Sequence, residues 1–231
     1  MLSLSKDNQD FRYDYKILKE KWGIEMFWDR ISPIYDLFEN IYNNKAYTGT
    51  GAKVADLINS DDKVLECACG TGAISVFIAA KCRELTATDF SVGMIKQTMK
   101  KCRKYKNVSF RRADITHLNC RDELFDKVVA GNVIHLLPEP EKAIKELERV
   151  VKPGGLIIIP TYINMSTGSG KLAVKFIEKL GASFKRQFDL ESYREFFKEM
   201  GYENAEYTVV DGRMPCAIAV IKKQTEQDRG K

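Results

Sequence analysis

Residues 64–73 read Val64-Leu65-Glu66-Cys67-Ala68-Cys69-Gly70-Thr71-Gly72-Ala73. The apolar start of this stretch predicts a buried strand, and the small residues after it predict a tight turn into a helix. Such a turn lets the backbone approach a ligand closely, next to the N–H groups at the start of the helix. The third glycine of a dinucleotide-binding loop is missing, because Ser75 stands in its place, and Glu66 ends the strand. A carboxylate there disfavours a pyrophosphate and suits a cationic ligand.

Beyond this turn, short apolar runs alternate with helical patterns, which is typical of a doubly wound α/β sheet. Strands are expected at residues 63–66, 84–88, 108–111, 125–130 and 156–160, and helices between them at 73–82, 92–104, 115–120 and 139–151. We expect Lys152-Pro153-Gly154-Gly155 to stop the last of these helices.

The C-terminal part of the sequence departs from this alternation. Two further helices are expected at 170–180 and 190–200, and two β-rich runs, 205–210 and 215–221, flank Asp211-Gly212, which predicts a hairpin. The expected fold is therefore a Rossmann-like, mostly parallel seven-stranded sheet that ends in an antiparallel β-hairpin. Residues 1–60, rich in aromatics, are expected to form a helical lid over the carboxyl edge of the sheet, and residues 223–231 a polar tail.

Composition limits the class of protein. The chain has 231 residues, of which 44% are hydrophobic and 30% charged, as in a single folded domain. No apolar run is long enough for a signal peptide or a membrane span, so we expect a cytoplasmic protein without stable membrane insertion. The six cysteines are scattered, which predicts reduced thiols and no metal site.

Positive charge is concentrated in one segment, although the net charge is only +5. The cluster consists of Lys96, Lys100, Lys101, Arg103, Lys104 and Lys106. Because Ile95, Met99 and Cys102 recur at helical spacing in the same segment, we interpret the cluster as the solvated face of an amphipathic helix. These cations should lie away from the reacting group, so a nucleic-acid substrate has no support.

Acidic residues mark the ends of three successive strands. Asp89 closes the second strand and Asp114 follows the third. Since open α/β sheets bind ligands beyond the carboxyl ends of their strands, Glu66, Asp89 and Asp114 should converge on one crevice. Asp89 can accept hydrogen bonds from ribose hydroxyls, and Asp114 from an adenine amino group, although Asp114 also fits an ordinary helix cap. S-adenosylmethionine, with its α-ammonium and sulfonium groups, matches this arrangement.

From Phe27 to about Ile221 the chain resembles class I S-adenosylmethionine-dependent methyltransferases, most closely the branch of the ubiquinone/menaquinone-biosynthesis methyltransferases. Similar motifs are the 27–36 segment FWDRISPIYD, the loop 66–72, Asp114-Ile115, the 132–138 segment NVIHLLP and Lys152-Pro153-Gly154-Gly155. The resemblance implies that residues 61–222 form a methyltransferase catalytic domain. It also implies cofactor binding by Tyr35, Glu66, Cys67, Ala68, Cys69, Gly70, Thr71, Gly72, Asp89, Phe90, Met94, Asp114, Ile115, Asn132 and Val133. Ala68 replaces the first glycine that is usual in the family.

The expected reaction is in-line transfer of the methyl group to a small-molecule acceptor, such as a quinol, phenol or thiol, with S-adenosylhomocysteine as the product. His135 is the candidate general base, because it is the only histidine near the predicted crevice. The alternative is a loop histidine that orders the turn into Pro138. Two other functions stay open, a regulatory protein that binds S-adenosylmethionine without turnover and an RNA or protein methyltransferase. The sequence leaves the oligomeric state open.

Overall fold

A computed structural model of the chain describes residues 22–163 and 186–225, apart from the side chains of residues 22–27 and 33–42. The strands are β1 (Lys63–Cys67), β2 (Glu84–Asp89), β3 (Val108–Arg112), β4 (Phe125–Ala130), β5 (Val151–Tyr162), β6 (Glu206–Val210) and β7 (Cys216–Lys222). The helices are α2 (Trp22–Asp56), α3 (Ser75–Ala79), α4 (Val92–Lys101), α5 (Pro140–Val150), α7 (Leu190–Glu199) and the 3-10 turn η1 (Ile134–Leu136).

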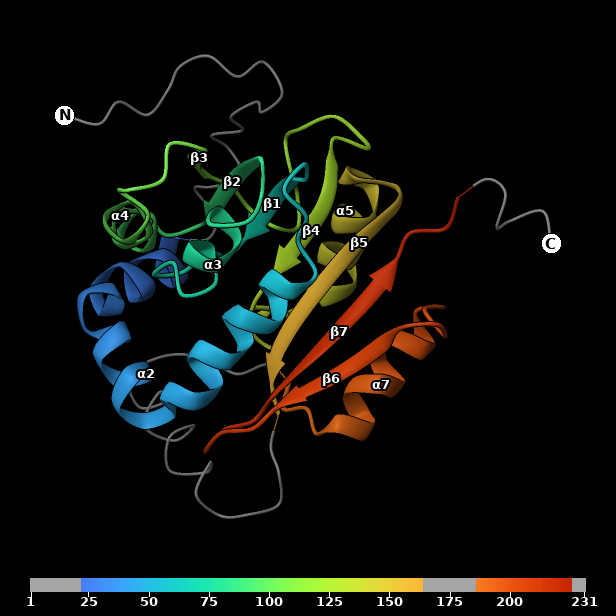
Figure 1. The fold of residues 1–231 in the computed structure, drawn as a ribbon. Helices are drawn as coiled ribbons and strands as arrows, with labels where there is room; N and C mark the ends of the chain where they lie inside the picture. The colour runs from blue at the N-terminus through green and yellow to red at the C-terminus, as the bar shows by residue number, and fades with distance from the viewer. Residues whose placement is uncertain (1–21, 164–185, 226–231) are drawn as a thin grey trace.

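The strands form one seven-stranded sheet in the order β3-β2-β1-β4-β5-β7-β6 (Figure 1). Strands β1 to β5 pair in parallel, and β7 pairs antiparallel with both β5 and β6. The expected fold, a mostly parallel sheet that ends in an antiparallel hairpin, is confirmed.

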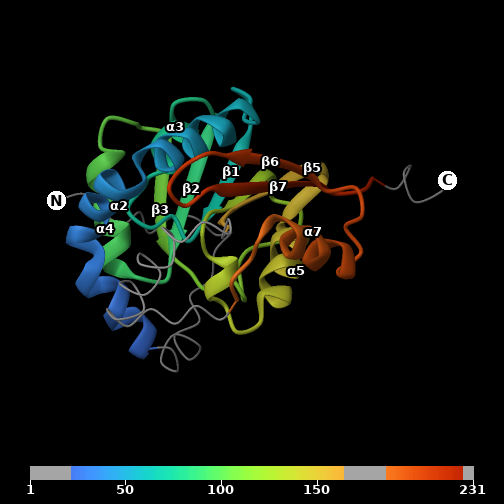
Figure 2. The same cartoon turned by 90° about the horizontal axis from the view of Figure 1, so that it is seen from below.

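Helices cover both faces of the sheet. Helices α5 and α7 lie on one side, and α3 and α4 on the other, where α2 also packs against them (Figures 1 and 2). Alternate residues of a strand point to opposite faces, so Val128 of β4 belongs to the core under α5 and Val129 to the core under α3. Strands whose residues are almost all apolar are expected to be buried on both faces, as they are in this sheet.

Helix α2 is one long helix with a kink at Asn43 (φ −138°, ψ 33°). The buried Asn43 side chain donates from Nδ2 to the Met214 carbonyl at 2.9 Å and accepts from the Met214 amide at 3.2 Å. A Cβ on Gly212, in the turn of the β6–β7 hairpin, would lie 2.6 Å from Asn43 Oδ1. The hairpin turn therefore closes directly on the kink of α2.

Two expected elements are wrong. Residues 115–120 form a turn rather than a helix; Asp114 Oδ1 accepts from both the amide (2.9 Å) and the hydroxyl (2.8 Å) of Thr116, and the His117 amide donates to the Asp114 carbonyl at 3.0 Å. The helix α5 does end just before Lys152-Pro153-Gly154-Gly155, but this segment lies inside β5 instead of preceding the strand. Gly154 donates to the Lys223 carbonyl at 2.9 Å, and Lys223 to the Gly155 carbonyl at 3.0 Å, which draws this segment into the sheet.

The other elements agree with expectation to within a few residues, except that α3 is shorter than the predicted 73–82. The helix predicted at 170–180 lies outside the described residues. In the part of the chain that the structure covers, no helix has the length and apolar character to cross a membrane. The boundaries 1–60, 61–222 and 223–231 stay a prediction.

Candidate active site

A cavity of about 230 Å³ opens at the carboxyl ends of the parallel strands, between the sheet and α2. It is lined by Trp28, Tyr47, Thr50, Glu66, Ala68, Cys69, Gly70, Thr71, Ala73, Ile74, Asp89, Phe90, Met94, Ala113, Asp114, Ile115, Gly131, Asn132, Val133, Leu136, Leu137, Pro138 and Tyr162. The wall is therefore mainly apolar and aromatic, with three carboxylates among it, as ligand sites generally are.

The loop after β1 bends sharply to form the floor of this cavity. Ala68, Gly70 and Gly72 all have positive φ, of 53°, 56° and 87°. Alanine tolerates this region poorly, so Ala68 holds a strained conformation that glycine would adopt without cost. At Gly72 a Cβ would lie 3.1 Å from the Thr98 backbone of α4, so Gly72 lets the loop pack against that helix.

Glu66 lies at the end of β1, with only 2% of the residue exposed. Among the described residues its Oε2 has no hydrogen-bond partner. Burial raises the pKa of this carboxyl to about 8; the neighbouring Ser75 hydroxyl opposes the rise, and the nearby Asp89 carboxylate adds to it. A buried carboxyl oxygen without a partner, facing a cavity, is suited to accept from a cationic amine such as an α-ammonium group.

Asp89, at the end of β2, stabilises the loop while facing the cavity. Its Oδ2 accepts from the Gly70 amide and its Oδ1 from the Ser91 amide, both at 2.8 Å. Burial raises the pKa of Asp89 to about 6, although these backbone hydrogen bonds oppose the rise. Each carboxylate oxygen can accept a further hydrogen bond, so Asp89 can still bind a diol.

Helix α2 joins this network through Asp29. Asp29 Oδ1 accepts from the Ser91 hydroxyl and, at 2.7 Å, from the Gly93 amide at the start of α4. A Cβ on Gly93 would lie 2.9 Å from the Asp29 Cα, so only glycine lets the two helices meet this closely. Through Ser91, Asp29 therefore connects α2 to Asp89.

The structure places most of the predicted cofactor-binding residues around the one cavity. Those that line it are Glu66, Ala68, Cys69, Gly70, Thr71, Asp89, Phe90, Met94, Asp114, Ile115, Asn132 and Val133. Cys67 and Gly72 do not line it, because Cys67 points into the core under α5 and Gly72 packs on α4. Tyr35 belongs to α2, but its side chain lies outside the described residues.

The structure does not bring His135 to the cavity wall. His135 sits in η1, 6% exposed, while its neighbours Val133 and Leu136 face the cavity. Burial lowers the pKa of the imidazole to about 4, so it is neutral and a weak base at physiological pH. This geometry favours the alternative interpretation, in which His135 orders the loop.

Several lining residues have no counterpart in the sequence-based prediction. Trp28 and Tyr47 reach the cavity from α2, and Tyr162 from the end of β5. Tyr47 is fixed by Lys101 of α4, whose Nζ donates to the Tyr47 hydroxyl at 2.8 Å. The aromatic richness of the N-terminal segment is the signal for this wall, but it does not say which rings face inward.

No metal site or disulfide bond is indicated among the described residues. No group of three or more His, Cys, Asp or Glu side chains there is placed to hold a metal ion. The buried Cys67 and Cys69 thiols pack beside the loop, and burial raises the pKa of both. Neither thiol is therefore a nucleophile at neutral pH.

Comparison with known proteins agrees with this site. A family model described as "Methyltransferase domain" matches residues 65–159. A demethylmenaquinone methyltransferase of Clavibacter sepedonicus is 32% identical over 145 residues, which cover 61% of this chain and 58% of that protein. The demethylmenaquinone methyltransferase of Staphylococcus aureus strain JH9 is 26% identical over an alignment that covers 94% of this chain and 99% of that protein.

Solved structures share the fold at low sequence identity. An S-adenosylmethionine-dependent methyltransferase from Thermotoga maritima aligns with a TM-score of 0.67 and 19% identity, over 86% of this chain and 99% of that one. The YcgJ protein of Bacillus subtilis aligns with a TM-score of 0.61 and 14% identity, over 78% and 98% of the two chains. Together with the site, these matches indicate a methyltransferase that uses S-adenosylmethionine and has the class I fold, similar in sequence to demethylmenaquinone methyltransferases.

Proposed function

We propose that this enzyme methylates a small, largely apolar acceptor, and that the first candidate is a quinol related to demethylmenaquinol. The observation that carries the proposal is the cavity itself, with the partnerless Glu66 oxygen at one end and an aromatic and aliphatic wall elsewhere. The names of the bacterial relatives point to the same acceptor class.

We assign the cofactor contacts by their chemistry. Glu66 would accept from the α-ammonium group and Asp89 from the ribose hydroxyls, while Asp114 and Ile115 would border the adenine. Bound S-adenosylmethionine supplies an electrophilic methyl group on a positively charged sulfur. Met94 and Phe90 complete an apolar wall beside these acids.

The residues of the chain would act mainly by position and by excluding water. Trp28, Tyr47 and Tyr162 form a wall that keeps the methyl-transfer site dry, which favours a transition state in which positive charge is dispersed. No histidine or lysine is among the described residues of the cavity wall. The quinol would thus lose one hydroxyl proton to solvent before it is enclosed; the new carbon–methyl bond would then form as the sulfur–methyl bond breaks, and the displaced ring proton would restore the hydroxyl group.

The test is an anaerobic assay of the purified full chain with S-adenosylmethionine and a reduced, short-chain naphthoquinol. We expect S-adenosylhomocysteine and a singly methylated quinol by mass spectrometry, and neither product when the acceptor is omitted. Phenol, thiol, amine and RNA acceptors are assayed in parallel. Methylation of RNA or protein alone would favour that alternative, and cofactor binding without any product would favour a regulatory protein.

The remaining parts of the proposal follow from the sequence. The lid of residues 1–60 and the catalytic part 61–222 would act as one domain, with a small-molecule acceptor and no nucleic-acid substrate. A cytoplasmic location belongs to the same proposal.

A further inference from the structure

The net positive charge of this chain comes from one segment. Residues 90–113 contain eight lysines and arginines and no aspartate or glutamate. Taking these eight from the chain's 37 lysines and arginines leaves 29 against 32 acidic residues, so the rest of the chain has a net charge of −3. The net charge of +5 therefore comes entirely from α4, β3 and the segment between them.

Three of the eight cations have contacts inside the protein. Lys101 is held by Tyr47, and Arg112 stacks over the Phe90 ring with its guanidinium carbon 5.1 Å from the centroid. Arg111 has buried guanidinium nitrogens. These three are part of the fold.

The other five cations are exposed, and none forms an ion pair in the part of the chain that the structure describes; they are Lys96, Lys100, Arg103, Lys104 and Lys106. Lys100 contacts only Gln97 on the same helix, at 3.4 Å, and Lys104 lies over the neighbouring Tyr105 ring. Surface lysines of a solvated helix commonly alternate with acids, but this helix has no acid to pair with them.

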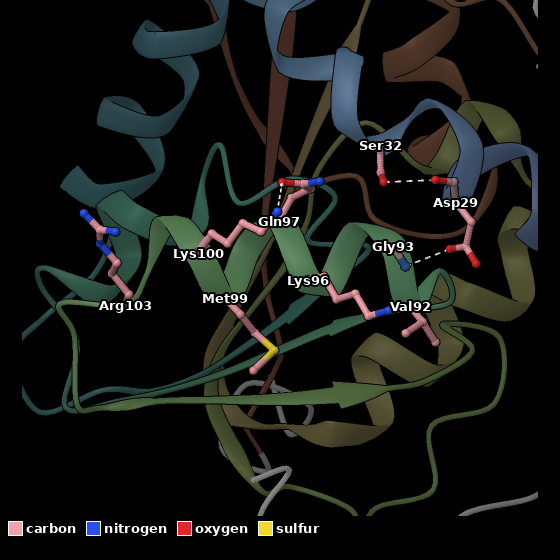
Figure 3. A pocket seen from close by; sticks show the side chains of 9 residues that line it. All are labelled: Asp29, Ser32, Val92, Gly93, Lys96, Gln97, Met99, Lys100 and Arg103. Carbon is pink, nitrogen blue, oxygen red and sulfur yellow. Dashed lines mark hydrogen bonds between the residues drawn. The ribbon is translucent and has the colours of Figure 1, made fainter. Parts of the chain in front are cut away.

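The outer face of α4 also carries apolar side chains. Val92, Lys96 and Met99 follow one another at helical spacing, and Arg103, just after the end of α4, continues the row; the buried side of the helix consists of Met94, Ile95 and Thr98. Val92 is 36% exposed. Figure 3 shows these four side chains around a groove between α4 and α2, which Lys100 and Asp29 also line. Met99 is half-buried, and cations next to partly exposed apolar side chains are typical of a helix that lies at a lipid surface.

We propose that this outer face of α4, defined by Val92, Lys96, Met99, Lys100 and Arg103, docks the enzyme on anionic lipid membranes. Charge complementarity with an acidic leaflet supports the partner, and Val92 and Met99 provide apolar contact with it. The choice of a lipid surface over RNA rests on the proposed function, because an apolar quinol dissolves in the bilayer.

The position of this face fits such a role. The groove and the cavity both lie where α2 meets α4. Asp29 and Gly93 line the groove, and their sequence neighbours Trp28 and Met94 line the cavity. A membrane bound at the groove would thus lie beside Trp28, one of the aromatic residues of the cavity wall.

The experiment is vesicle flotation with the full chain, in the absence of both quinol and S-adenosylmethionine. We expect binding to phosphatidylcholine vesicles that contain about one third phosphatidylglycerol, and little binding to pure phosphatidylcholine. The variant Lys96→Gln/Lys100→Gln/Arg103→Gln should bind more weakly by roughly fivefold per lost cation, on the order of a hundredfold in all.

The matched control removes three exposed lysines from α5, α7 and β7, as Lys145→Gln/Lys198→Gln/Lys222→Gln. The net charge changes equally, so an equal loss in both variants would show that α4 is not the docking face. Equal binding to neutral and anionic vesicles, or preferential binding of RNA over vesicles, would also overturn the proposal.

A second readout separates this proposal from the catalytic one. Methyl transfer to a water-soluble quinol should be the same in the α4 variant and the wild type, because none of its three residues lines the cavity. If the wild type binds anionic vesicles but methylates no quinol, the docking surface stands and the acceptor class is wrong. The reverse result would refute the docking surface alone.

Discussion

The substitution Glu66→Gln tests whether a buried carboxyl is kept ready for a cationic ligand. Glutamine has nearly the same shape as glutamic acid but cannot ionise. Since the pKa of Glu66 is raised from 4.5 to about 8, the folded protein holds this proton more tightly than the unfolded chain does. The stability that this proton provides is complete below the unfolded pKa and is lost as the pH rises through about 8.

The magnitude of the effect follows from the two pKa values. A rise of about 3.5 pK units corresponds to a ceiling of roughly 5 kcal/mol in the free energy of unfolding. The pKa of Asp89 is also raised, from 3.8 to about 6, so below pH 6 both groups contribute to the pH dependence of stability. Between pH 6 and pH 8 the fall in stability comes from Glu66 and is at most roughly 3 kcal/mol, while His135, with its lowered pKa, opposes it slightly.

The assay is urea unfolding of the ligand-free protein at pH 6 and at pH 8. We expect the free energy of unfolding of the wild type to fall over this interval and that of Glu66→Gln not to fall; the lowered pKa of His135 adds the same rise, less than about 1 kcal/mol, to both proteins. The control variant Glu203→Gln, at an exposed position, should follow the wild type. Parallel curves for the wild type and Glu66→Gln would refute the reasoning.

Ligand binding gives an independent measurement of the same group. An α-ammonium group stabilises the ionised form of Glu66, so S-adenosylhomocysteine should bind the wild type more tightly at pH 8 than at pH 6. In Glu66→Gln this pH dependence should be reduced. The affinity at pH 8 should be lower by about ten- to hundredfold, because a charge-assisted hydrogen bond is lost.

Three further substitutions test the rest of the site. Asp89→Ala should weaken S-adenosylhomocysteine binding by roughly ten- to hundredfold in calorimetry, and an unchanged affinity would move the ribose contact elsewhere. Asp29→Ala should weaken the same binding by about tenfold through the loss of its contacts to Ser91 and Gly93, while Asp29→Asn, which keeps an acceptor oxygen, should restore part of it. His135→Ala should lower the free energy of unfolding by about 2 kcal/mol and leave turnover per folded molecule within about twofold; a hundredfold loss of turnover with intact cofactor affinity would instead make His135 the base.

The convergence of the acids could be predicted from the sequence for a geometric reason. In a parallel sheet all strands point the same way, so Glu66 and Asp89, which each end a strand, must meet at one edge. The hairpin at Asp211-Gly212 was predictable because its signal is local. Both features depend on short stretches of chain and on a rule that holds for the whole fold class.

The errors have non-local or competing causes. The strand character of Gly154 and Gly155 depends on Lys223, which no local pattern reveals. At Asp114 the helix-cap pattern was present, but hydrogen bonds to Thr116 close a turn instead. For His135, the position beside the cavity was predictable, whereas the direction of its side chain depends on the packing of η1 against the core.

The contact between Asn43 and Met214 makes the N-terminal helix and the C-terminal hairpin depend on each other. Two hydrogen bonds hold the kink of α2 against the hairpin turn that follows β6, and they join residues 171 positions apart in the sequence. A C-terminal deletion that begins before this hairpin therefore removes part of the support for the cavity wall, although it leaves every acid of the site in place. Fragment complementation could exploit this: a chain cut between α7 and β6 should regain cofactor binding only when the hairpin fragment is supplied.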